Sequence, residues 1–258
     1  MEDLSIVKIG GNIIEDSDAL DQFLTLFAQL PGHKILVHGG GKKATQLLPQ
    51  LGIEPKMVNG RRITDAATLE VVTMVYGGLV NKNVVAQLQA KGINAIGLSG
   101  ADANTIQAQK RPVTEIDYGF AGDVKGVDGE TIGKLIHIGL TPVFCALTHN
   151  NKGQLLNTNA DTITAEVAIG LSNHFNTTIY YCFELDGVLE DINRKDSVIK
   201  HISTTTYDTL VSNGIIAEGM LPKMHNCFHA LKNGVKQVKI GNLGMFQTAN
   251  TNYTTLVL

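Results

Sequence analysis

The sequence lacks any apolar run long enough to cross a lipid bilayer. A membrane-spanning helix needs about 18 consecutive apolar residues, and no segment of the 258 residues approaches that length. The first residues, MEDLSIVKIGG, carry two acids and lead directly into a strand pattern, which is unlike a secretory signal peptide. We therefore expect no membrane partner and a cytoplasmic location.

Cysteine is scarce. The three cysteines, Cys145, Cys182 and Cys227, lie in apolar segments and show no CxxC spacing. A disulfide framework needs cysteines in matched pairs, and a zinc site needs them at short, regular spacing, so neither fits this sequence. The pattern predicts buried free thiols in a reducing compartment.

The chain also lacks an excess of positive charge. Its net charge is −3 and its pI is about 6.2, and its lysines and arginines are scattered. Because a nucleic-acid-binding surface needs a cluster of basic side chains, we expect no nucleic-acid partner. Any anion-binding site in this acidic chain must be built locally.

Two familiar motifs are absent or incomplete. No segment matches GxxxxGK[ST], which excludes a P-loop nucleotide site. His225 and His229 have the spacing of the zinc motif HExxH, but Asn226 stands in place of its glutamate and no third ligand is evident. We expect surface or core histidines here and no metal ligands from the protein.

Apolar strand patterns alternate with helical patterns along most of the chain. The expected strands are 5–9, 34–37, 93–98, 142–147, 177–183, 235–240 and 254–258. The expected helices are 16–30, 65–76, 79–91, 128–140, 162–171 and 205–213. Thr64 is expected to cap the second helix, and Gly77 and Gly78 to break the chain before the third. The alternation predicts an α/β fold with an open, mostly parallel sheet between helices.

Two further segments, 105–110 and 122–127, alternate polar and apolar residues and have glycine, aspartate and proline between them. This pattern is typical of antiparallel strands. We expect a ribbon beside the main sheet. No repeat or linker marks a domain boundary, and we place a division between two lobes near residue 172.

Residues 34–48, KILVHGGGKKATQLL, hold the most informative pattern in the chain. A buried strand runs directly into Gly39, Gly40 and Gly41, and a helix begins close to the glycines. Bare backbone N–H groups and the positive end of a helix then face one small volume, and a Cβ there would keep an anion from the backbone. The segment predicts an anion site, most plausibly for a phosphate.

The same glycines leave a second interpretation open. Gly39, Gly41 and Ala44 satisfy GxGxxA between a strand and a helix, the fingerprint of dinucleotide binding. No acid follows about 20 residues later, where Arg61 and Arg62 stand instead, and arginines there suit the 2′-phosphate of NADP. An NADP-dependent enzyme therefore fits this motif taken alone.

Three ionisable side chains stand at the ends of predicted elements. Lys8 either points to water from the end of its strand or aims its ammonium group at the crevice outside the strand ends. Asp161 either caps the helix that follows or holds lysines in a cleft. Lys223 begins a helix and opposes its dipole, so a negative partner such as a phosphate is expected.

Two loops carry further candidates. Arg61 and Arg62 precede a helix and are either solvated or positioned to bind a substrate carboxylate. Residues 184–189, ELDGVL, follow a strand and form either a simple turn or a neighbour of an adenine or ribose.

Nine segments in this order make the chain similar to a known family. They are IVKIGGN (6–12), VHGGG (37–41), NGRRIT (59–64), EVVTMVYGGLVNK (70–82), GLSGADAN (97–104), DYGFAGDV (117–124), LLNTNADTITAE (155–166), ELDGVL (184–189) and GIIAEGMLPK (214–223). The chain resembles the amino-acid kinase family over essentially its whole length. Within that family it resembles the members that phosphorylate N-acetyl-L-glutamate.

The resemblance implies an open eight-stranded sheet, with an acylglutamate site in an N-lobe (1–172) and an ATP site in a C-lobe (173–258). It implies ATP-dependent phosphorylation of the side-chain carboxylate of N-acetyl-L-glutamate, in arginine biosynthesis, with Mg²⁺ carried by the nucleotide. Alternatives are a kinase of another small carboxylate (N-succinylglutamate, glutamate, aspartate or carbamate), an NADP-dependent reductase and a non-catalytic sensor.

The resemblance also implies roles for individual residues. Lys8 and Lys223 would contact the transferring phosphoryl group, and Asp161 would position both lysines. Backbone N–H groups of Gly10, Gly11, Gly40 and Gly41 would face the phosphates and the attacking carboxylate. Arg62 and Asn157 would bind the acylglutamate. The nucleotide would lie against Glu184, Leu185, Asp186, Gly187, Val188, Leu189, Ile215, Ile216 and Ala217.

Some positions depart from the family pattern. Arg61 replaces an apolar residue, Lys42 and Lys43 replace a Pro-Gln-like pair, and Glu184 replaces a small or short polar residue. The chain also lacks the N-terminal helical extension of the arginine-inhibited, hexameric members. We therefore expect a homodimer that arginine does not inhibit.

Overall fold

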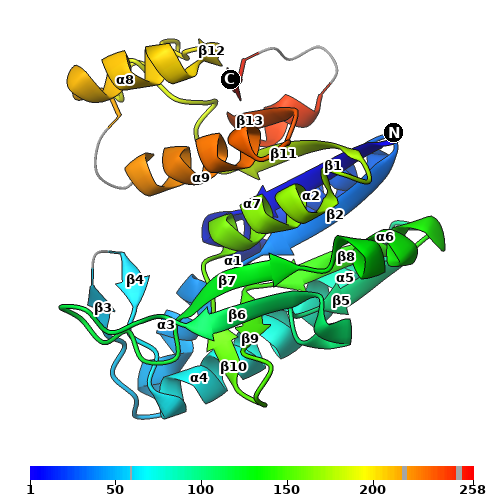
Figure 1. The fold of residues 1–258 in the computed structure, drawn as a ribbon, viewed down its shortest axis with the longest axis vertical. Coiled ribbons are helices and arrows are strands. Elements are labelled where there is room, and N and C mark those ends of the chain that lie inside the picture. Colours follow the sequence, from blue (N-terminus) through cyan, green and yellow to red (C-terminus); the bar gives the residue numbers. More distant parts are fainter. Residues whose placement is uncertain (59, 217–219, 248–251) are drawn as a thin grey trace.

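The main sheet has eight strands in the order β12-β14-β13-β11-β1-β2-β8-β5 (Figure 1). The computed structural model describes residues 1–58, 60–216, 220–247 and 252–258. Among the described strands of this sheet, only β13 and β14 pair antiparallel. The strands are β1 (Asp3–Ile9), β2 (His33–His38), β5 (Ala95–Leu98), β8 (Thr141–Cys145), β11 (Asn176–Cys182), β12 (His201–Ile202), β13 (Gln237–Gly241) and β14 (Thr254–Leu256). The expected α/β fold is confirmed.

Two smaller sheets lie below the main sheet in Figure 1. One has the order β10-β9-β6-β7 and is built from β6 (Ile106–Lys110), β7 (Gly122–Val127), β9 (Leu147–His149) and β10 (Leu155–Asn157). Strands β6 and β7 pair antiparallel, so the predicted ribbon is confirmed. The other is the hairpin of β3 (Met57–Val58) and β4 (Arg61–Arg62).

Helices cover both faces of the main sheet. They are α1 (Gly11–Glu15), α2 (Ser17–Gln29), α3 (Gly41–Gln50), α4 (Ala66–Thr73), α5 (Asn81–Ala90), α6 (Gly129–His137), α7 (Ala160–Leu171), α8 (Thr204–Ser212) and α9 (Met220–Lys232). Helices α6, α7 and α9 pack together on one face, and α2 packs on the other beside α5. Short 3-10 helices, η2 (Asp102–Asn104) and η3 (Leu243–Phe246), complete the described elements.

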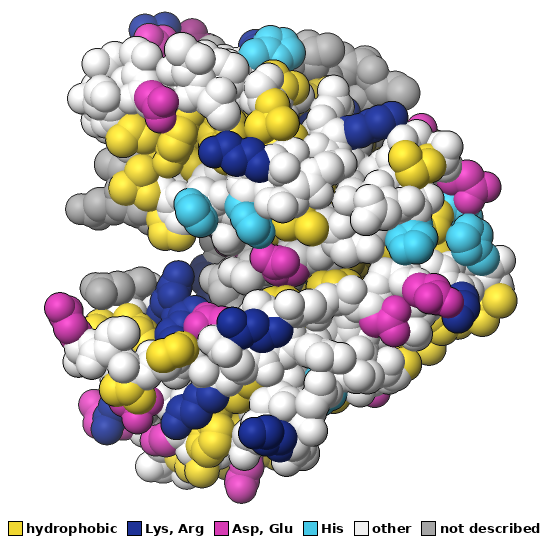
Figure 2. All heavy atoms as spheres, in the orientation of Figure 1, with side chains coloured by type: hydrophobic (Ala, Val, Ile, Leu, Met, Phe, Trp, Pro, Cys, Tyr) yellow, Lys and Arg dark blue, Asp and Glu magenta, His cyan; other side chains and the backbone are white. Residues whose placement is uncertain are grey.

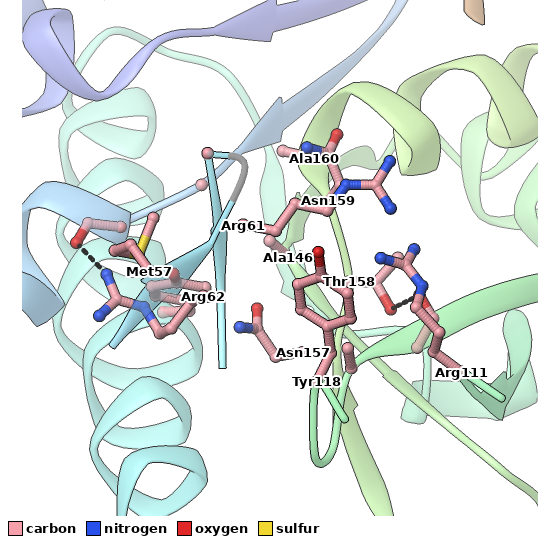
Figure 3. Close-up of a pocket in the computed structure, with 16 residues that line it drawn as sticks. Met57, Arg61, Arg62, Arg111, Tyr118, Ala146, Asn157, Thr158, Asn159 and Ala160 are labelled. Carbon is pink, nitrogen blue, oxygen red and sulfur yellow. Dashed lines mark hydrogen bonds between the residues drawn. The ribbon is translucent and has the colours of Figure 1, made fainter. Parts of the chain in front are cut away.

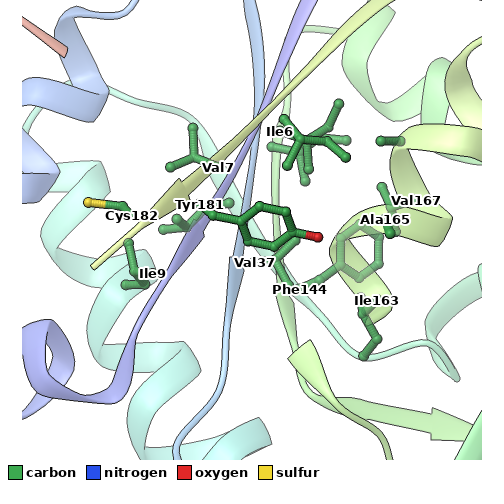
Figure 4. Packing of buried hydrophobic residues seen from close by; sticks show 14 of the residues in the cluster. Ile6, Val7, Ile9, Val37, Phe144, Ile163, Ala165, Val167, Tyr181 and Cys182 are labelled. Atoms are coloured by element: carbon green, nitrogen blue, oxygen red, sulfur yellow. The ribbon is translucent and has the colours of Figure 1, made fainter. Parts of the chain in front are cut away.

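The core lies between the helices and the central strands. The apolar stripe of α2 is fully or almost fully buried, as its helical spacing predicts: Leu20, Phe23, Leu24 and Phe27. Figure 4 shows Tyr181 of β11 packed among Ile6, Val37 and Ile163. The Tyr181 hydroxyl donates a hydrogen bond to the backbone carbonyl of Asp161, at 3.0 Å. The core thereby fixes the start of α7.

The prediction of a break at Gly77 and Gly78 is wrong. The chain continues from α4 through a π-helical segment, η1 (Met74–Val80), into α5 without leaving helical geometry. A π-helix makes i→i+5 hydrogen bonds, so these glycines keep the backbone bonds that an interruption would forfeit. The predicted cap is also wrong by one residue, because the carboxylate of Asp65, not the hydroxyl of Thr64, accepts from the N–H of Thr68.

Candidate active site

Two glycine turns lie side by side at the carboxyl ends of adjacent strands. Strands β1 and β2 are parallel, with Ile9 opposite His38 in the ladder. Gly10 then begins α1 and Gly40 begins α3, and neither helix start has a side-chain cap. The N–H groups of Gly11, Gly40 and Gly41 make no hydrogen bond to a described residue. Two of these donors, the N–H groups of Gly40 and Gly41, belong to the segment for which the sequence predicted an anion site.

Next to these turns, Asp161 joins two lysines from distant parts of the chain. Its Oδ1 lies 2.8 Å from Nζ of Lys8, and its Oδ2 lies 3.0 Å from Nζ of Lys223. Lys8 is the penultimate residue of β1, Asp161 lies in the first turn of α7, and Lys223 lies in the first turn of α9. Both lysines are largely removed from water, with side chains 12% and 30% exposed. The structure thus brings the three predicted catalytic residues together.

The carboxylate of Asp161 is ionised despite its burial. Burial alone would raise its pKa, but the charges of Lys8 and Lys223 and their hydrogen bonds outweigh that effect and hold the pKa at about 2. Helix capping, the alternative role for Asp161, belongs to Asn159, whose side chain accepts from the N–H groups of Asp161 and Thr162. Asp161 is therefore free to pair with lysines.

A pocket of about 220 Å³ opens beside the second glycine turn. Its lining includes Gly39 and Gly41, residues of the β3–β4 hairpin, and Asn157, Thr158, Asn159 and Ala160 ahead of α7. In Figure 3, Arg62 and Arg111 lie on opposite sides of the pocket, with Asn157 between them. Figure 2 shows the corresponding hollow, with basic side chains along its lower edge.

The two terminal nitrogens of the Arg62 guanidinium group have different surroundings. Its Nη2 donates to the carbonyl of Gly41 at 2.9 Å and to Oγ1 of Thr45 at 2.7 Å. Its Nη1 is buried and has no hydrogen-bond partner among the residues that the structure describes. An unpaired buried guanidinium nitrogen is costly, so this atom points to a bound anion. The amide of Asn157, the other predicted substrate residue, donates to Oγ1 of Thr64 at 3.0 Å, which leaves its oxygen available.

The structure adds three pocket residues that the sequence did not single out. Tyr76 comes from η1, and Arg111 and Tyr118 come from the connection between β6 and β7. Arg111 donates from Nε to the carboxylate of Asp123 at 3.0 Å, and its guanidinium lies over the ring of Tyr118. No sequence signal marked them, because Tyr76 has the pattern of one residue of an apolar helix face and Arg111 that of a loop residue.

The ring of Tyr76 explains why position 40 is a glycine, and this explanation differs from the one that the sequence suggested. A Cβ at Gly40 would lie 2.6 Å from Cδ1 of the Tyr76 ring, which is itself buried. The sequence suggested that a side chain there would obstruct an anion. In the structure the ring of Tyr76 already fills that side of the turn.

The predicted nucleotide residues lie in two loops of the C-terminal part. The loop after β11 holds Glu184, Leu185, Asp186 and Gly187, and the carboxylate of Asp186 accepts from the side-chain amides of Asn242 and Asn252. The side chains of Val188, Leu189 and Ile216 are buried, so only their backbone is available to a ligand. Ile215 is partly buried against the core. Ala217 lies outside the described residues.

Comparison with known proteins decides the family. The model of the amino acid kinase family matches residues 3–242. The chain belongs to the amino acid kinase family. Acetylglutamate kinases of Bacteroides thetaiotaomicron and Phocaeicola vulgatus are 56% and 57% identical to it over 239 residues, 93% of each chain. The solved structure of Giardia lamblia carbamate kinase bound to AMP-PNP superposes with a TM-score of 0.67 at 15% identity, covering 99% of this chain and 98% of that one. The second likeness concerns the fold alone.

Within the described part of this amino acid kinase, no helix is long and apolar enough to cross a membrane. In the same residues no group of three or more His, Cys, Asp and Glu side chains could hold a metal ion. His229 instead contacts Glu166 of α7, with Nε2 and Oε1 3.1 Å apart.

Asp161 should make the stability of this kinase depend on pH in the acid range. Its pKa falls from 3.8 to about 2 on folding, so its contribution is fully present above pH 4 and is lost as pH falls through 2. Between pH 5 and 2 we expect the free energy of unfolding of the wild type to fall by about 2 kcal/mol more than that of Asp161→Asn. Urea unfolding at a series of pH values measures this difference.

The matched control is Asp21→Asn, which removes a carboxylate 66% exposed and paired with Lys91 on the surface. It should follow the wild type at every pH, because an exposed pair contributes little. Parallel pH curves for wild type and Asp161→Asn would contradict the assigned pKa.

Proposed function

We propose that the protein transfers the γ-phosphoryl group of ATP to the side-chain carboxylate of N-acetyl-L-glutamate, a step of arginine biosynthesis. The observation that carries the proposal is the Lys8–Asp161–Lys223 cluster beside two uncapped glycine turns and an arginine-lined pocket. Relatives 56% identical over 93% of their length are acetylglutamate kinases, which supports the same acceptor here.

The chemistry needs charge neutralisation more than acid–base catalysis. A carboxylate oxygen of the acceptor attacks the γ-phosphorus, a new P–O bond forms, and the bond to ADP breaks with its electrons. Because the carboxylate is already ionised, no proton has to be removed. Lys8 and Lys223 would stabilise the negative charge of the transferring group, and Asp161 would hold the two ammonium groups in place.

The acceptor site follows from the free donors of the pocket. Nη1 of Arg62 would bind the α-carboxylate, and Asn157 would bind the acyl amide. The N–H groups of Gly40 and Gly41 would face the reacting carboxylate and the transferring phosphoryl group. These assignments place the acceptor in the N-lobe, residues 1–172.

The nucleotide would bind in the C-lobe, residues 173–258, with the 184–189 loop and residues 215–217 beside the base and ribose. The N–H group of Gly11 would lie at its phosphates. The N–H group of Gly10, which the sequence also proposed for this role, donates instead to the carbonyl of Cys182 at 3.2 Å. Mg²⁺, which neutralises phosphate charge, would be held by the nucleotide, since the Asp161 carboxylate is already paired with two ammonium groups. The protein's own contribution is then the two lysines and the backbone donors.

The test is coupled ADP release with Mg-ATP and a panel of acceptors: N-acetyl-L-glutamate, N-succinyl-L-glutamate, L-glutamate, L-aspartate and carbamate. Turnover confined to the acylated glutamates supports the proposal. Turnover of a free amino acid or of carbamate would reassign the acceptor. If the folded protein turns over none of these acceptors, a reductase or a sensor would be favoured. Binding of NADP would reveal a reductase.

One observation favours a second acceptor, N-succinyl-L-glutamate. Arg61 lines the pocket, is exposed, and forms no ion pair with a described residue. Its guanidinium would suit a carboxylate at the far end of the acyl group.

Arg61→Met tests this pairing directly. An exposed ion pair contributes about 1 kcal/mol, so we expect kcat/KM for N-succinyl-L-glutamate to fall about fivefold. The value for N-acetyl-L-glutamate, which lacks that carboxylate, should stay within twofold and serves as the internal control. Equal changes for both acceptors would remove Arg61 from acyl recognition.

We also propose that the protein is a homodimer and is not inhibited by arginine. Met74 and Leu79 support a protein interface on η1, because these large apolar side chains are 55% and 47% exposed. Sedimentation velocity tests the assembly, and a monomer or a hexamer would contradict it.

A further inference from the structure

A buried histidine stands directly behind the second glycine turn. His38 is the last residue of β2 and has no exposed surface. Its Nδ1 donates to the carbonyl of Gly39 at 2.7 Å, and its Nε2 accepts from Nδ2 of Asn81 at 3.0 Å. The proposed reaction gives His38 no role so far.

Asn81 fixes which nitrogen of His38 carries the proton. The same Nδ2 of Asn81 donates to the carbonyl of Val143 at 2.9 Å, and Oδ1 of Asn81 accepts from Nζ of Lys82 at 3.1 Å. The amide nitrogen therefore faces the ring, and His38 must accept at Nε2 and donate at Nδ1. Burial lowers the pKa of His38 to about 4. The hydrogen bond to Gly39 raises this pKa and the charge of Lys82 lowers it, but burial has the largest effect. The ring is thus neutral and its donor is permanent.

His38 acts from the face of the sheet opposite the lysine cluster. In the parallel pairing of β1 and β2, Lys8 lies opposite Val37 and Ile9 lies opposite His38. Opposed residues share a face and successive residues alternate, so Lys8 and His38 point to different faces. The helix that supplies Asn81, α5, therefore supports the glycine turn from behind.

The hydrogen bond to Gly39 sets the direction of a donor in the proposed site. The peptide plane between Gly39 and Gly40 is rigid, and its C=O and N–H point in opposite directions. With the carbonyl held by His38, the N–H of Gly40 must point away from His38, and it has no partner among the described residues. Three consecutive glycines fix their own backbone poorly, so this direction needs an external constraint.

We propose that His38 is a positioning residue for phosphoryl transfer, which holds the Gly39–Gly40 peptide so that the Gly40 N–H faces the reacting group. Asn81 keeps the ring of His38 in the required orientation. The inference rests on the proposed kinase function. A misdirected donor lowers transition-state stabilisation while leaving most binding contacts intact.

Two variants of His38 separate positioning from packing. In His38→Asn, the amide nitrogen takes about the place of Nδ1 and keeps the donor to Gly39, but the contact with Asn81 is lost. In His38→Gln, the amide oxygen takes about the place of Nε2 and accepts from Asn81, but no donor reaches Gly39. Each variant loses one hydrogen bond, so thermal unfolding should show similar losses of stability.

The expected result is a difference in turnover. We expect kcat of His38→Gln to fall about tenfold or more with KM for ATP within threefold, and His38→Asn to retain most of kcat. Equal kcat values for the two variants would overturn the proposal. If either fails to fold, Asn81→Ala replaces it: kcat should fall severalfold at unchanged KM for ATP, and an unchanged kcat would overturn the role of the pair.

Failure of the proposed kinase function can be distinguished from failure of the proposed role of His38. The wild type is first assayed on the acceptor panel, and no turnover there refutes the kinase proposal before any variant is compared. Turnover of any acceptor by the wild type allows the His38 comparison, because the position of the Gly40 N–H bears on transfer to every carboxylate.

Discussion

Replacing Lys8 with methionine is expected to lower kcat about a thousandfold while the Kd for ATP changes only a few-fold. The ammonium group of Lys8, 2.8 Å from Asp161 and 12% exposed, lies in a poorly hydrated site where a charge stabilises transferring phosphate strongly. Methionine keeps most of the side-chain volume and removes only the charge. Steady-state ADP release gives kcat, and equilibrium titration with a non-hydrolysable ATP analogue gives the affinity.

The control for this change is Lys91→Met, which removes a lysine whose partner, Asp21, is on the surface. It should leave kcat within twofold. Lys223→Met should resemble Lys8→Met, because both ammonium groups share Asp161. Near-normal turnover in Lys8→Met or Lys223→Met would take that lysine out of the mechanism.

Replacing Arg62 with methionine is expected to raise KM for the acceptor about thirtyfold or more. The free Nη1 of Arg62 is buried, and breaking a buried contact between a guanidinium and a carboxylate costs about 2–5 kcal/mol. The KM for ATP should change little, since Arg62 lies on the β3–β4 hairpin, away from the two loops proposed for the nucleotide. Initial rates over a range of both substrates measure the two constants.

Arg62 also holds the hairpin to α3 through Gly41 and Thr45, so a structural loss has to be separated from a lost substrate contact. Arg62→Lys preserves the charge but not the two-pronged geometry, and an intermediate KM is expected. Arg194→Met, a change at a surface ion pair, controls for loss of an arginine elsewhere. An unchanged acceptor KM in a folded Arg62→Met protein would refute the assignment of Arg62.

Local pattern was sufficient to predict many of the elements that build the site, but not the β3–β4 hairpin that carries Arg62. Short β-branched runs predicted β1, β2 and β11. The spacing of apolar residues over 20–27 predicted α2, because a helix that is buried on one face carries apolar residues at every third or fourth position. The glycines after β1 and β2 marked both turns. Where the pattern failed, at Gly77 and Gly78, a π-helix kept the backbone bonds that glycine usually interrupts.

The motifs in chain order predicted the family, and the family model and close relatives confirm it. They also predicted Lys8, Asp161 and Lys223 as one set, whose catalytic roles stay predictions. Periodicity alone left two of the three with an ordinary alternative, a surface lysine for Lys8 and a helix cap for Asp161. Their spacing along the chain carries no information about contact.

The sequence by itself determined most strands of the main sheet, most helices, the glycine turns and the family, because these depend on local propensity and on segments read in order. The tertiary structure alone decided that Asp161 bridges two lysines, that Tyr76 covers Gly40, and that Arg62 keeps one nitrogen free for a ligand. It also brought Asn81 of α5 into contact with His38 of β2. Each of these contacts joins residues far apart in the chain, and only the packing of helices on both faces of a parallel sheet sets such distances.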